Sequence, residues 1–415
     1  MLRPPSLTPL VPHEHVLPNG NTLYYFPNAS LELVKLDFTV EAGSAYQPVK
    51  TLAHAANMIF AEATKSHDAQ QMAEFVDFRG IVVERMIDVC ASNVSFYFLR
   101  KYAAELIPLI REIFEEPMVT PQLLDTYRSH RRQQLQTNFQ KTSYRARNTF
   151  YEMLYTFRHP LGTYALPSDV DLLTPEMVSD YWRQHYRLNM AHIVMAGNID
   201  EELLALADKF LSPKSEGLAS PISLTDSVRP ASTTQHVVVP SAVQTTIRVG
   251  RILPMSWNSE EYAQFMVLNT ILGGYFGSRL MSNIREEKGY TYGIYSQTQI
   301  HRGSIVFYIT ADVASESAQD AVNEVFVEIR RLRDEQVSEE ELELVRNYMM
   351  GDFIRSIDGI FEISERYRQM VATNVTEQLS YNLLAAIQSV TPAQLQQLAQ
   401  RYLTDLITVT AGPEK

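Results

Sequence analysis

The sequence predicts an α+β fold built from two similar halves. The chain has 415 residues, which is more than one domain usually holds. A unit of helix followed by strand occurs near the middle of the chain and again at its end. Strand-like and long helical stretches are mixed without a regular βαβ rhythm, which favours α+β layers.

The first half contains the earlier copy of this unit. Residues 31–40 alternate apolar and polar side chains, which predicts a strand with one buried face. Thr174 before Pro175 predicts a helix start, because threonine caps helices well and proline fits their first position. The apolar stretch 193–195 then predicts a strand.

The second half repeats the pattern. Thr391-Pro392 and the β-branched stretch 407–410 follow the first unit after about 215 residues, which indicates duplicated domains rather than a short-period solenoid. Further strands are expected at residues 237–239 and 245–249, and amphipathic helices at residues 318–332 and 339–350. Serine, proline and glycine residues at 212–221, and Arg229-Pro230, predict a linker. We therefore expect domains at 1–219 and 220–415.

Charge and composition limit which partners and which cellular location are expected. The net charge of −12 argues against nucleic acid and anionic membranes, and would suit a basic peptide. No apolar run approaches the ~18 residues of a membrane span. Prolines among residues 1–10 replace the apolar core of a signal peptide, so a cytoplasmic location is expected. Cys90 is the only cysteine, and its apolar neighbours predict a buried, inert thiol.

His54 stands where a zinc helix of the form His-x-x-Glu-His would begin. In such a helix two histidines four residues apart share one face and bind the metal, while the glutamate activates a bound water. Here Asn57 replaces the glutamate and Met58 replaces the second histidine. An amide accepts no proton at neutral pH, and a thioether is a poor zinc ligand. The residues alone indicate a core histidine rather than a metal ligand.

A family likeness is nevertheless carried by four segments, residues 17–23, 41–44, 272–280 and 284–296. The chain resembles the pitrilysin/insulinase-type zinc peptidases, in the compact bacterial branch related to mitochondrial processing peptidase. The resemblance implies two homologous α+β domains, each a mainly antiparallel sheet flanked by helices, that face each other as half of a clamshell. It also implies a dimer that closes a chamber around an extended peptide.

The same resemblance assigns residues to the missing metal site. It implies a third zinc ligand, a glutamate about 75 residues after the motif, near Gln133, Gln134 and Gln136. No aspartate or glutamate occurs from Thr126 to Tyr151, so a small misalignment cannot supply the ligand. Glutamine is a weak zinc ligand. We therefore predict that this chain binds no metal and no other cofactor, with zinc expected in a partner subunit.

The second half contains the residues to which the resemblance assigns substrate binding. Arg285 and Tyr292 have the spacing of an Arg/Tyr pair that binds substrate carbonyls and stabilises the oxyanion in the family's active chamber. Gly273 and Gly274 are candidates for contacting substrate, although a glycine turn at a helix end is the simpler interpretation. Tyr290 and Tyr295 are expected to be packing residues.

These residues lead to one favoured hypothesis and two alternatives. The favoured one is the zinc-free subunit of a two-chain peptidase that hydrolyses unfolded or short peptides together with a zinc-bearing paralogue. One alternative is a scaffold, as in the core subunits of the respiratory cytochrome bc complex. The other is a homodimer that binds peptides without cleaving them.

Overall fold

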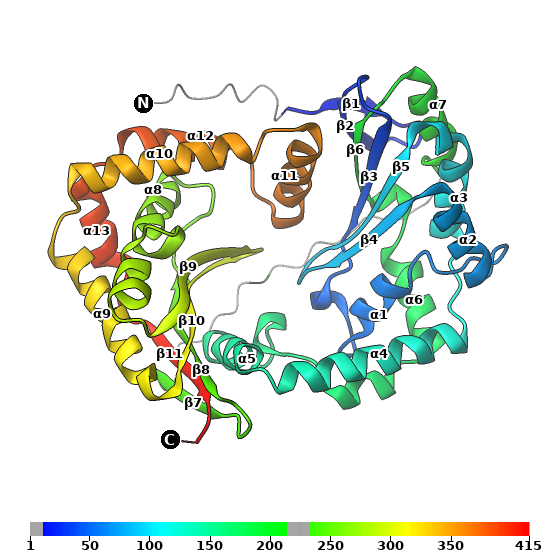
Figure 1. Ribbon diagram of the computed structural model, residues 1–415. Coiled ribbons are helices and arrows are strands. Elements are labelled where there is room, and N and C mark those ends of the chain that lie inside the picture. Colours follow the sequence, from blue (N-terminus) through cyan, green and yellow to red (C-terminus); the bar gives the residue numbers. More distant parts are fainter. Residues whose placement is uncertain (1–10, 214–223, 225–232, 415) are drawn as a thin grey trace.

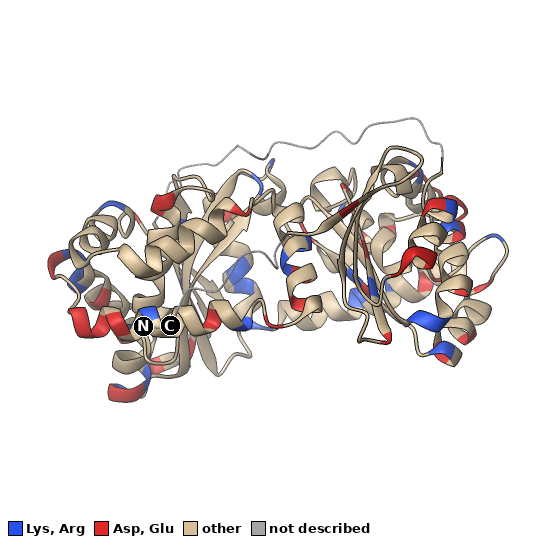
Figure 2. Ribbon diagram, turned by 90° about the horizontal axis from the view of Figure 1, so that it is seen from above, with Lys and Arg blue, Asp and Glu red and all other residues tan. Residues whose placement is uncertain are grey.

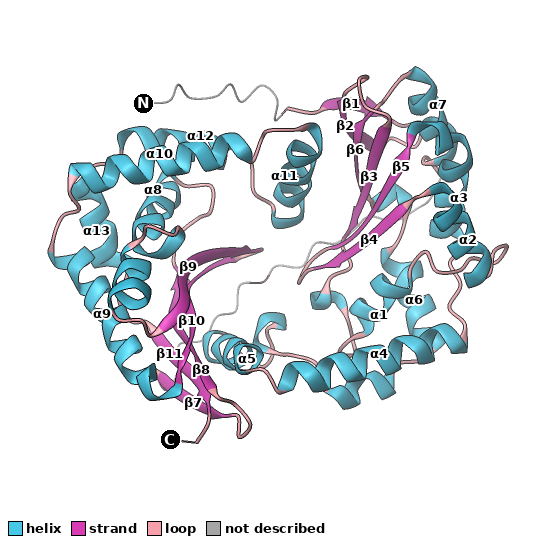
Figure 3. Cartoon of the chain, viewed as in Figure 1, coloured by secondary structure: helices cyan, strands magenta, loops and turns pink. Residues whose placement is uncertain are grey.

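The computed structural model describes residues 11–213, 224 and 233–414. The described residues form two sheets with helices around them (Figure 3). The first sheet has six strands in the order β1-β2-β6-β3-β5-β4. Every neighbouring pair in it is antiparallel except the pair β2 and β6, which is parallel. Its strands are β1 (His13–Val16), β2 (Thr22–Pro27), β3 (Leu33–Val40), β4 (Val82–Ile87), β5 (Ser92–Leu99) and β6 (His192–Gly197).

The second sheet is five-stranded, in the order β7-β11-β8-β10-β9, and only β7 and β11 are parallel. Strand β9 forms one edge of it. The expected α+β fold with two mainly antiparallel sheets is thereby confirmed. Its strands are β7 (Thr234–Val238), β8 (Gln244–Leu253), β9 (Thr291–His301), β10 (Ser304–Ala314) and β11 (Ile407–Gly412).

Helices cover the outer face of each sheet (Figure 1). Viewed from above, the molecule is elongated, with one sheet in each half and charged residues spread over the outer helices (Figure 2). The first half contains α1 (Leu52–Ile59), α2 (Ala69–Arg79), α3 (Ala103–Glu115), α4 (Pro121–Phe139), α5 (Thr142–Leu154), α6 (Pro175–His185) and α7 (Glu201–Phe210). The second contains α8 (Glu260–Asn269), α9 (Ala318–Asp334), α10 (Glu339–Arg355), α11 (Ile360–Thr373), α12 (Gln378–Ser389) and α13 (Pro392–Tyr402).

Two helices cross from one half to the other. Helix α5 belongs to the first half but packs on β8 and β11 of the second sheet, where Phe150 and Tyr155 join a cluster with Val306 and Val409. Helix α11 belongs to the second half but packs on β2, β3 and β6 of the first sheet (Figure 1). Each sheet therefore depends on the other half of the sequence for the cover of its inner face.

The repeated unit lies where the sequence places it. Thr174 accepts a hydrogen bond from the Met177 amide at the start of α6, and Thr391 does the same for the Gln394 amide at the start of α13. Each helix leads into a central strand, β6 in one sheet and β11 in the other. The two copies thus occupy matching places in the two halves.

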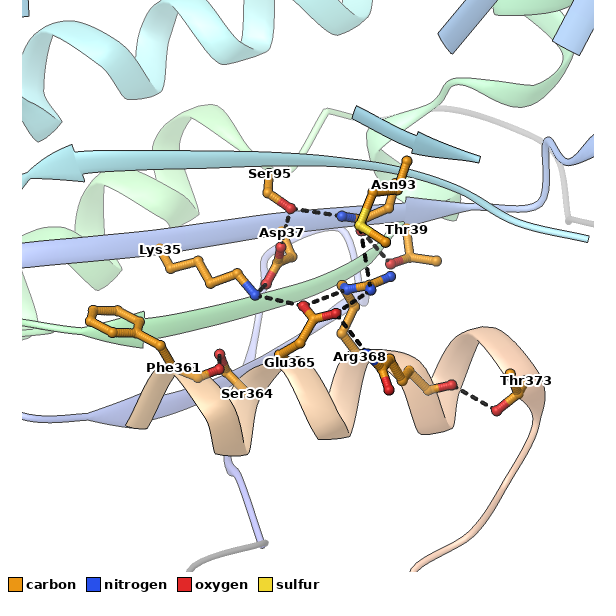
Figure 4. Close-up of polar contacts among 12 residues, drawn as sticks. Lys35, Asp37, Thr39, Asn93, Ser95, Phe361, Ser364, Glu365, Arg368 and Thr373 are labelled. Atoms are coloured by element: carbon orange, nitrogen blue, oxygen red, sulfur yellow. Dashed lines mark hydrogen bonds and ion pairs between the residues drawn. The ribbon is translucent and has the colours of Figure 1, made fainter. Parts of the chain in front are cut away.

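The expectation that residues 31–40 form a strand with one buried face is wrong in one respect. The strand exists as β3, but Val34 to Val40 are buried on both faces. Its polar residues Lys35, Asp37 and Thr39 do not meet solvent, because α11 covers them. Figure 4 shows Glu365 and Arg368 of α11 among these side chains.

Some expectations fall outside the described residues. The proline-rich residues 1–10 and most of the expected linker, including the boundary between 219 and 220, are among them. Of the helices that the structure does describe, none is both long and apolar enough to cross a bilayer. Cys90 is buried as expected, and burial raises the pKa of its thiol to about 11.

Candidate functional site

The remnant of the zinc motif begins at His54 on α1. His54 Nδ1 lies 3.0 Å from the Tyr127 hydroxyl of α4, and the two rings are in contact. Burial lowers the pKa of His54 to about 3, and the nearby charge of Arg131 lowers it further in the same direction. The imidazole is therefore neutral at pH 7 and has a hydroxyl partner.

The next two positions of the motif serve the core. Asn57 is fully buried, and its Nδ2 donates to the Asn93 carbonyl of β5 at 3.3 Å. Met58 is partly buried and packs against the core of the first half. One residue therefore holds α1 to the sheet and the other fills space between apolar side chains.

The expected third ligand position is also unsuited to zinc. Gln134 is exposed on α4 and accepts a hydrogen bond from Arg131 Nη1 at 2.5 Å. A guanidinium beside His54 repels a divalent cation. In the part of the chain that the structure describes, no group of three or more His, Cys, Asp or Glu side chains could hold a metal ion. The residues present therefore do not fit zinc.

Arg285 and Tyr292 lie close together on the second half, where Arg285 is half-buried and Tyr292 is exposed. Arg285 lies in the π-helical turn η8 (Met281–Glu287), and Tyr292 is on the edge strand β9. The guanidinium carbon of Arg285 lies 4.4 Å from the centre of the Phe276 ring and 5.7 Å from that of Tyr292. Tyr292 is 94% exposed and Phe276 is 59% exposed. We call Phe276, Arg285 and Tyr292 the Arg/Tyr surface.

The neighbouring glycines and tyrosines have varied roles. Gly273 is buried, and a Cβ there would lie 2.6 Å from the Ser296 amide nitrogen, so close packing against β9 already accounts for this glycine. Gly274 is exposed. Tyr290 packs against the second core as expected, but Tyr295 is 43% exposed, so its expected packing role is wrong. Tyr295 projects from an edge strand, where neighbouring elements do not cover every side chain.

The structure keeps the two candidate places apart. The pocket beside His54 is lined by Gln299 and His301 of β9, but not by Arg285 or Tyr292. Tyr292 precedes Gln299 by seven residues on β9, which is roughly 23 Å along a strand. The Arg/Tyr surface therefore does not complete the His54 remnant within one chain.

Comparisons with known proteins agree with this architecture. A family model described as "Peptidase M16 inactive domain" matches residues 172–349. An "Uncharacterized zinc protease" from Rickettsia bellii (strain RML369-C) is 23% identical over 412 residues, or 96% of each chain. The crystal structure of a peptidase M16 inactive domain from Pseudomonas fluorescens has a TM-score of 0.85 at 19% identity, and covers 97% of this chain and 98% of that one. The chain thus resembles the M16 peptidases in sequence over residues 172–349, and in fold over nearly its whole length.

Although the chain resembles M16 peptidases, it lacks the zinc motif after His54. It is also similar to a protein named "Non-peptidase homolog YmxG" from Helicobacter pylori (strain ATCC 700392 / 26695), at 22% identity over 301 residues, which is 70% of this chain and 67% of that one. The family resemblance drawn from the sequence is thereby confirmed.

The sequence analysis missed one group of residues near His54. Lys50, Arg131 and Arg147 line the pocket beside it. The signal was present in the sequence, since residues 126–151 contain no aspartate or glutamate but do contain Lys141 and five arginines, at positions 128, 131, 132, 145 and 147.

Proposed function

We propose that this chain is the zinc-free subunit of a two-chain peptidase and supplies Arg285 and Tyr292 to a composite site. The observation that carries the proposal is the contrast between the two places. The metal-binding positions are occupied by residues that serve packing, whereas Arg285 and Tyr292 remain together on an exposed edge. Among the described residues, Arg285 has neither an ion pair nor a hydrogen bond, so its donors are available.

The chemistry of this pair suits peptide hydrolysis. A zinc-bearing partner would supply the activated water. Negative charge then develops on the carbonyl oxygen, and the Tyr292 hydroxyl is a donor that stabilises it. The Arg285 guanidinium would hold another substrate carbonyl and fix the register of an extended peptide. The contact of Arg285 with the Phe276 and Tyr292 rings orients the guanidinium before substrate arrives.

The test is reconstitution with an intact M16 zinc subunit from the same genome. Coexpression and sizing should give a mixed species of about twice the mass of one chain, with peptidase activity that a chelator abolishes. Arg285→Ala should reduce kcat/KM by about 10²–10³-fold, and Arg285→Lys should restore only part of it, because an ammonium lacks the planar fork.

Arg330→Ala is the matched control, because Arg330 is exposed on α9 and is not a residue of the Arg/Tyr surface. A mixed species whose activity is unchanged by Arg285→Ala would favour the scaffold alternative. If no mixed species forms and the chain is stable by itself, the peptide-binding homodimer is favoured instead.

A further inference from the structure

A pocket lined by polar and aromatic side chains lies beside His54. It has a volume of about 370 Å³ and lies where α1, α4 and α5 meet the end of β9. Tyr144, Tyr151 and Tyr164 contribute aromatic walls. Such a space suits a small molecule or the end of a peptide chain.

The charges around this pocket are unbalanced. Lys50, Arg131 and Arg147 line it, and none of them makes an ion pair with another residue that the structure describes. Asp88 is the acidic residue in the lining, and its carboxylate accepts a hydrogen bond from the Val89 amide at 2.6 Å. The whole chain carries a net charge of −12, so a locally cationic pocket stands out against its surroundings.

Two buried polar groups in the lining have no partner. Asn148 is 8% exposed and its Nδ2 makes no hydrogen bond, and Thr51 is 3% exposed and its hydroxyl makes none. Buried polar groups are normally paired, so each of these calls for an explanation. Thr51 also has a φ of 70°, in the left-handed region that a β-branched residue seldom adopts. Strain and unpaired donors in one pocket are typical of a binding site.

We propose that this pocket binds a carboxylate carried by a small, partly apolar molecule. A planar guanidinium binds a carboxylate through two parallel hydrogen bonds, and the Asn148 amide and Thr51 hydroxyl supply neutral donors to the same group. The tyrosine rings would cover the apolar part of the ligand. The negative charge of the protein as a whole disfavours a polyanion, which points to a ligand of low charge.

Two sources share this chemistry, the free C-terminus of a peptide and a small carboxylic acid. The site requires neither a partner subunit nor zinc, so it is independent of the proposed function. Binding can therefore be measured on the purified chain alone, and failure of one proposal leaves the other standing.

Calorimetric titration distinguishes the sources. The probes are N-acetyl-Ala-Ala-Phe with a free carboxylate, the same peptide as its C-terminal amide, N-acetylphenylalanine, and inorganic phosphate. The free acid should bind at least about tenfold more tightly than the amide. If N-acetylphenylalanine binds as well as the peptide, the ligand is a small acid; if the peptide binds more tightly, it is a peptide end. Three outcomes would overturn the proposal. The acid and the amide bind equally well, phosphate binds as tightly as the acid, or no probe binds at millimolar concentration.

Variants then place the binding in this pocket. Arg147→Gln changes an exposed residue and should weaken binding of the free acid by roughly 10- to 100-fold, and Arg131→Gln should do the same. Arg158→Gln is the matched control, since this exposed arginine shortly after α5 does not line the pocket and its loss should leave the affinity within about twofold. Melting curves check the fold of each variant. Equal affinities of all three variants and the parent chain would also overturn the proposal.

Discussion

Under α11, Lys35, Asp37, Glu365 and Arg368 pair with one another, whereas Arg285 on the second half has no ionic partner among the described residues. Lys35 Nζ lies 3.2 Å from Asp37 Oδ2 and 2.9 Å from Glu365 Oε2 (Figure 4). Ser95 donates to Asp37, and Arg368 pairs with Glu365. We call Lys35, Asp37, Glu365 and Arg368 the ionic cluster.

The contrast separates charged groups that stabilise the fold from groups that are available to bind a substrate. Lys35, Asp37 and Arg368 of the ionic cluster are buried between β3 and a helix from the other half of the sequence, so removing one of them leaves a charged partner unpaired away from water. On the Arg/Tyr surface, Phe276 and Tyr292 are exposed and the half-buried Arg285 has no ion pair among the described residues, so removing one of these side chains leaves no buried charge unpaired. Changes in the ionic cluster should therefore alter stability, and changes on the Arg/Tyr surface should alter only activity.

The largest effect is expected from Lys35→Met. This change leaves the Asp37 carboxylate buried without its nearest cation and should lower the free energy of unfolding by about 3–5 kcal/mol. Urea denaturation measures the loss, and Lys65→Met on the surface is the control. Adding Asp37→Leu to Lys35→Met should recover much of it, because no lone charge then remains. A Lys35→Met variant as stable as its control would erase the distinction between the two regions.

Tyr292→Phe tests the other region. It removes one exposed hydroxyl, so stability should stay within about 0.5 kcal/mol of the parent chain. In the reconstituted pair, kcat should fall by about 10²–10³-fold, or ~2.7–4 kcal/mol, with a smaller change in KM. Tyr295→Phe, on the same strand and also exposed, is the matched control. Steady-state kinetics in which both variants match the parent would show that the Arg/Tyr surface is a relic.

Local patterns predicted much of the fold. The threonine–proline pairs at 174 and 391 marked two helix starts because capping depends on residues only three positions apart. The crossing of α5 and α11 could not be predicted in this way, because it joins segments far apart in the sequence. For the same reason Lys35, Asp37 and Thr39 resembled a solvent-facing row, although a helix some 330 positions later covers them.

The candidate site could likewise be predicted only in part. Arg285 and Tyr292 were found from a motif, since both lie in one short segment. The pocket beside His54 draws its residues from α1, α4, α5, β9 and the turn after β4, and no single window of sequence contains them. The absence of acidic residues between 126 and 151 was informative about zinc, but only the structure places Arg131 and Arg147 beside His54.

Acid should weaken the ionic cluster before it affects other contacts of α11. Although burial raises it, hydrogen bonds from Arg368 and Lys35 lower the pKa of Glu365 to about 2, against an ordinary 4.5. A lowered folded-state pKa means that the stabilisation is present above about pH 5 and is lost as pH falls toward 2. Because Glu365 is one-third exposed, we expect a loss of only about 1–2 kcal/mol. Melting temperatures between pH 5 and 2.5 should fall less steeply in Glu365→Gln, and parallel curves would contradict this assignment.

The smallest effect is expected from zinc itself. A metal that binds the folded chain raises its melting temperature in proportion to the logarithm of metal concentration over Kd. His54 has a pKa of about 3, so it is free of a proton at pH 7, yet the other motif positions offer a buried amide and a thioether, and Arg131 repels a cation. Equimolar zinc should therefore leave the melting temperature unchanged, and a chelator should not lower it.

Asn57→Glu with Met58→His should not create tight zinc binding, because Gln134 still replaces the third carboxylate and position 57 is fully buried. Metal analysis that finds one tightly held zinc per chain in the unaltered protein would contradict this prediction and show that the region around His54 still binds metal.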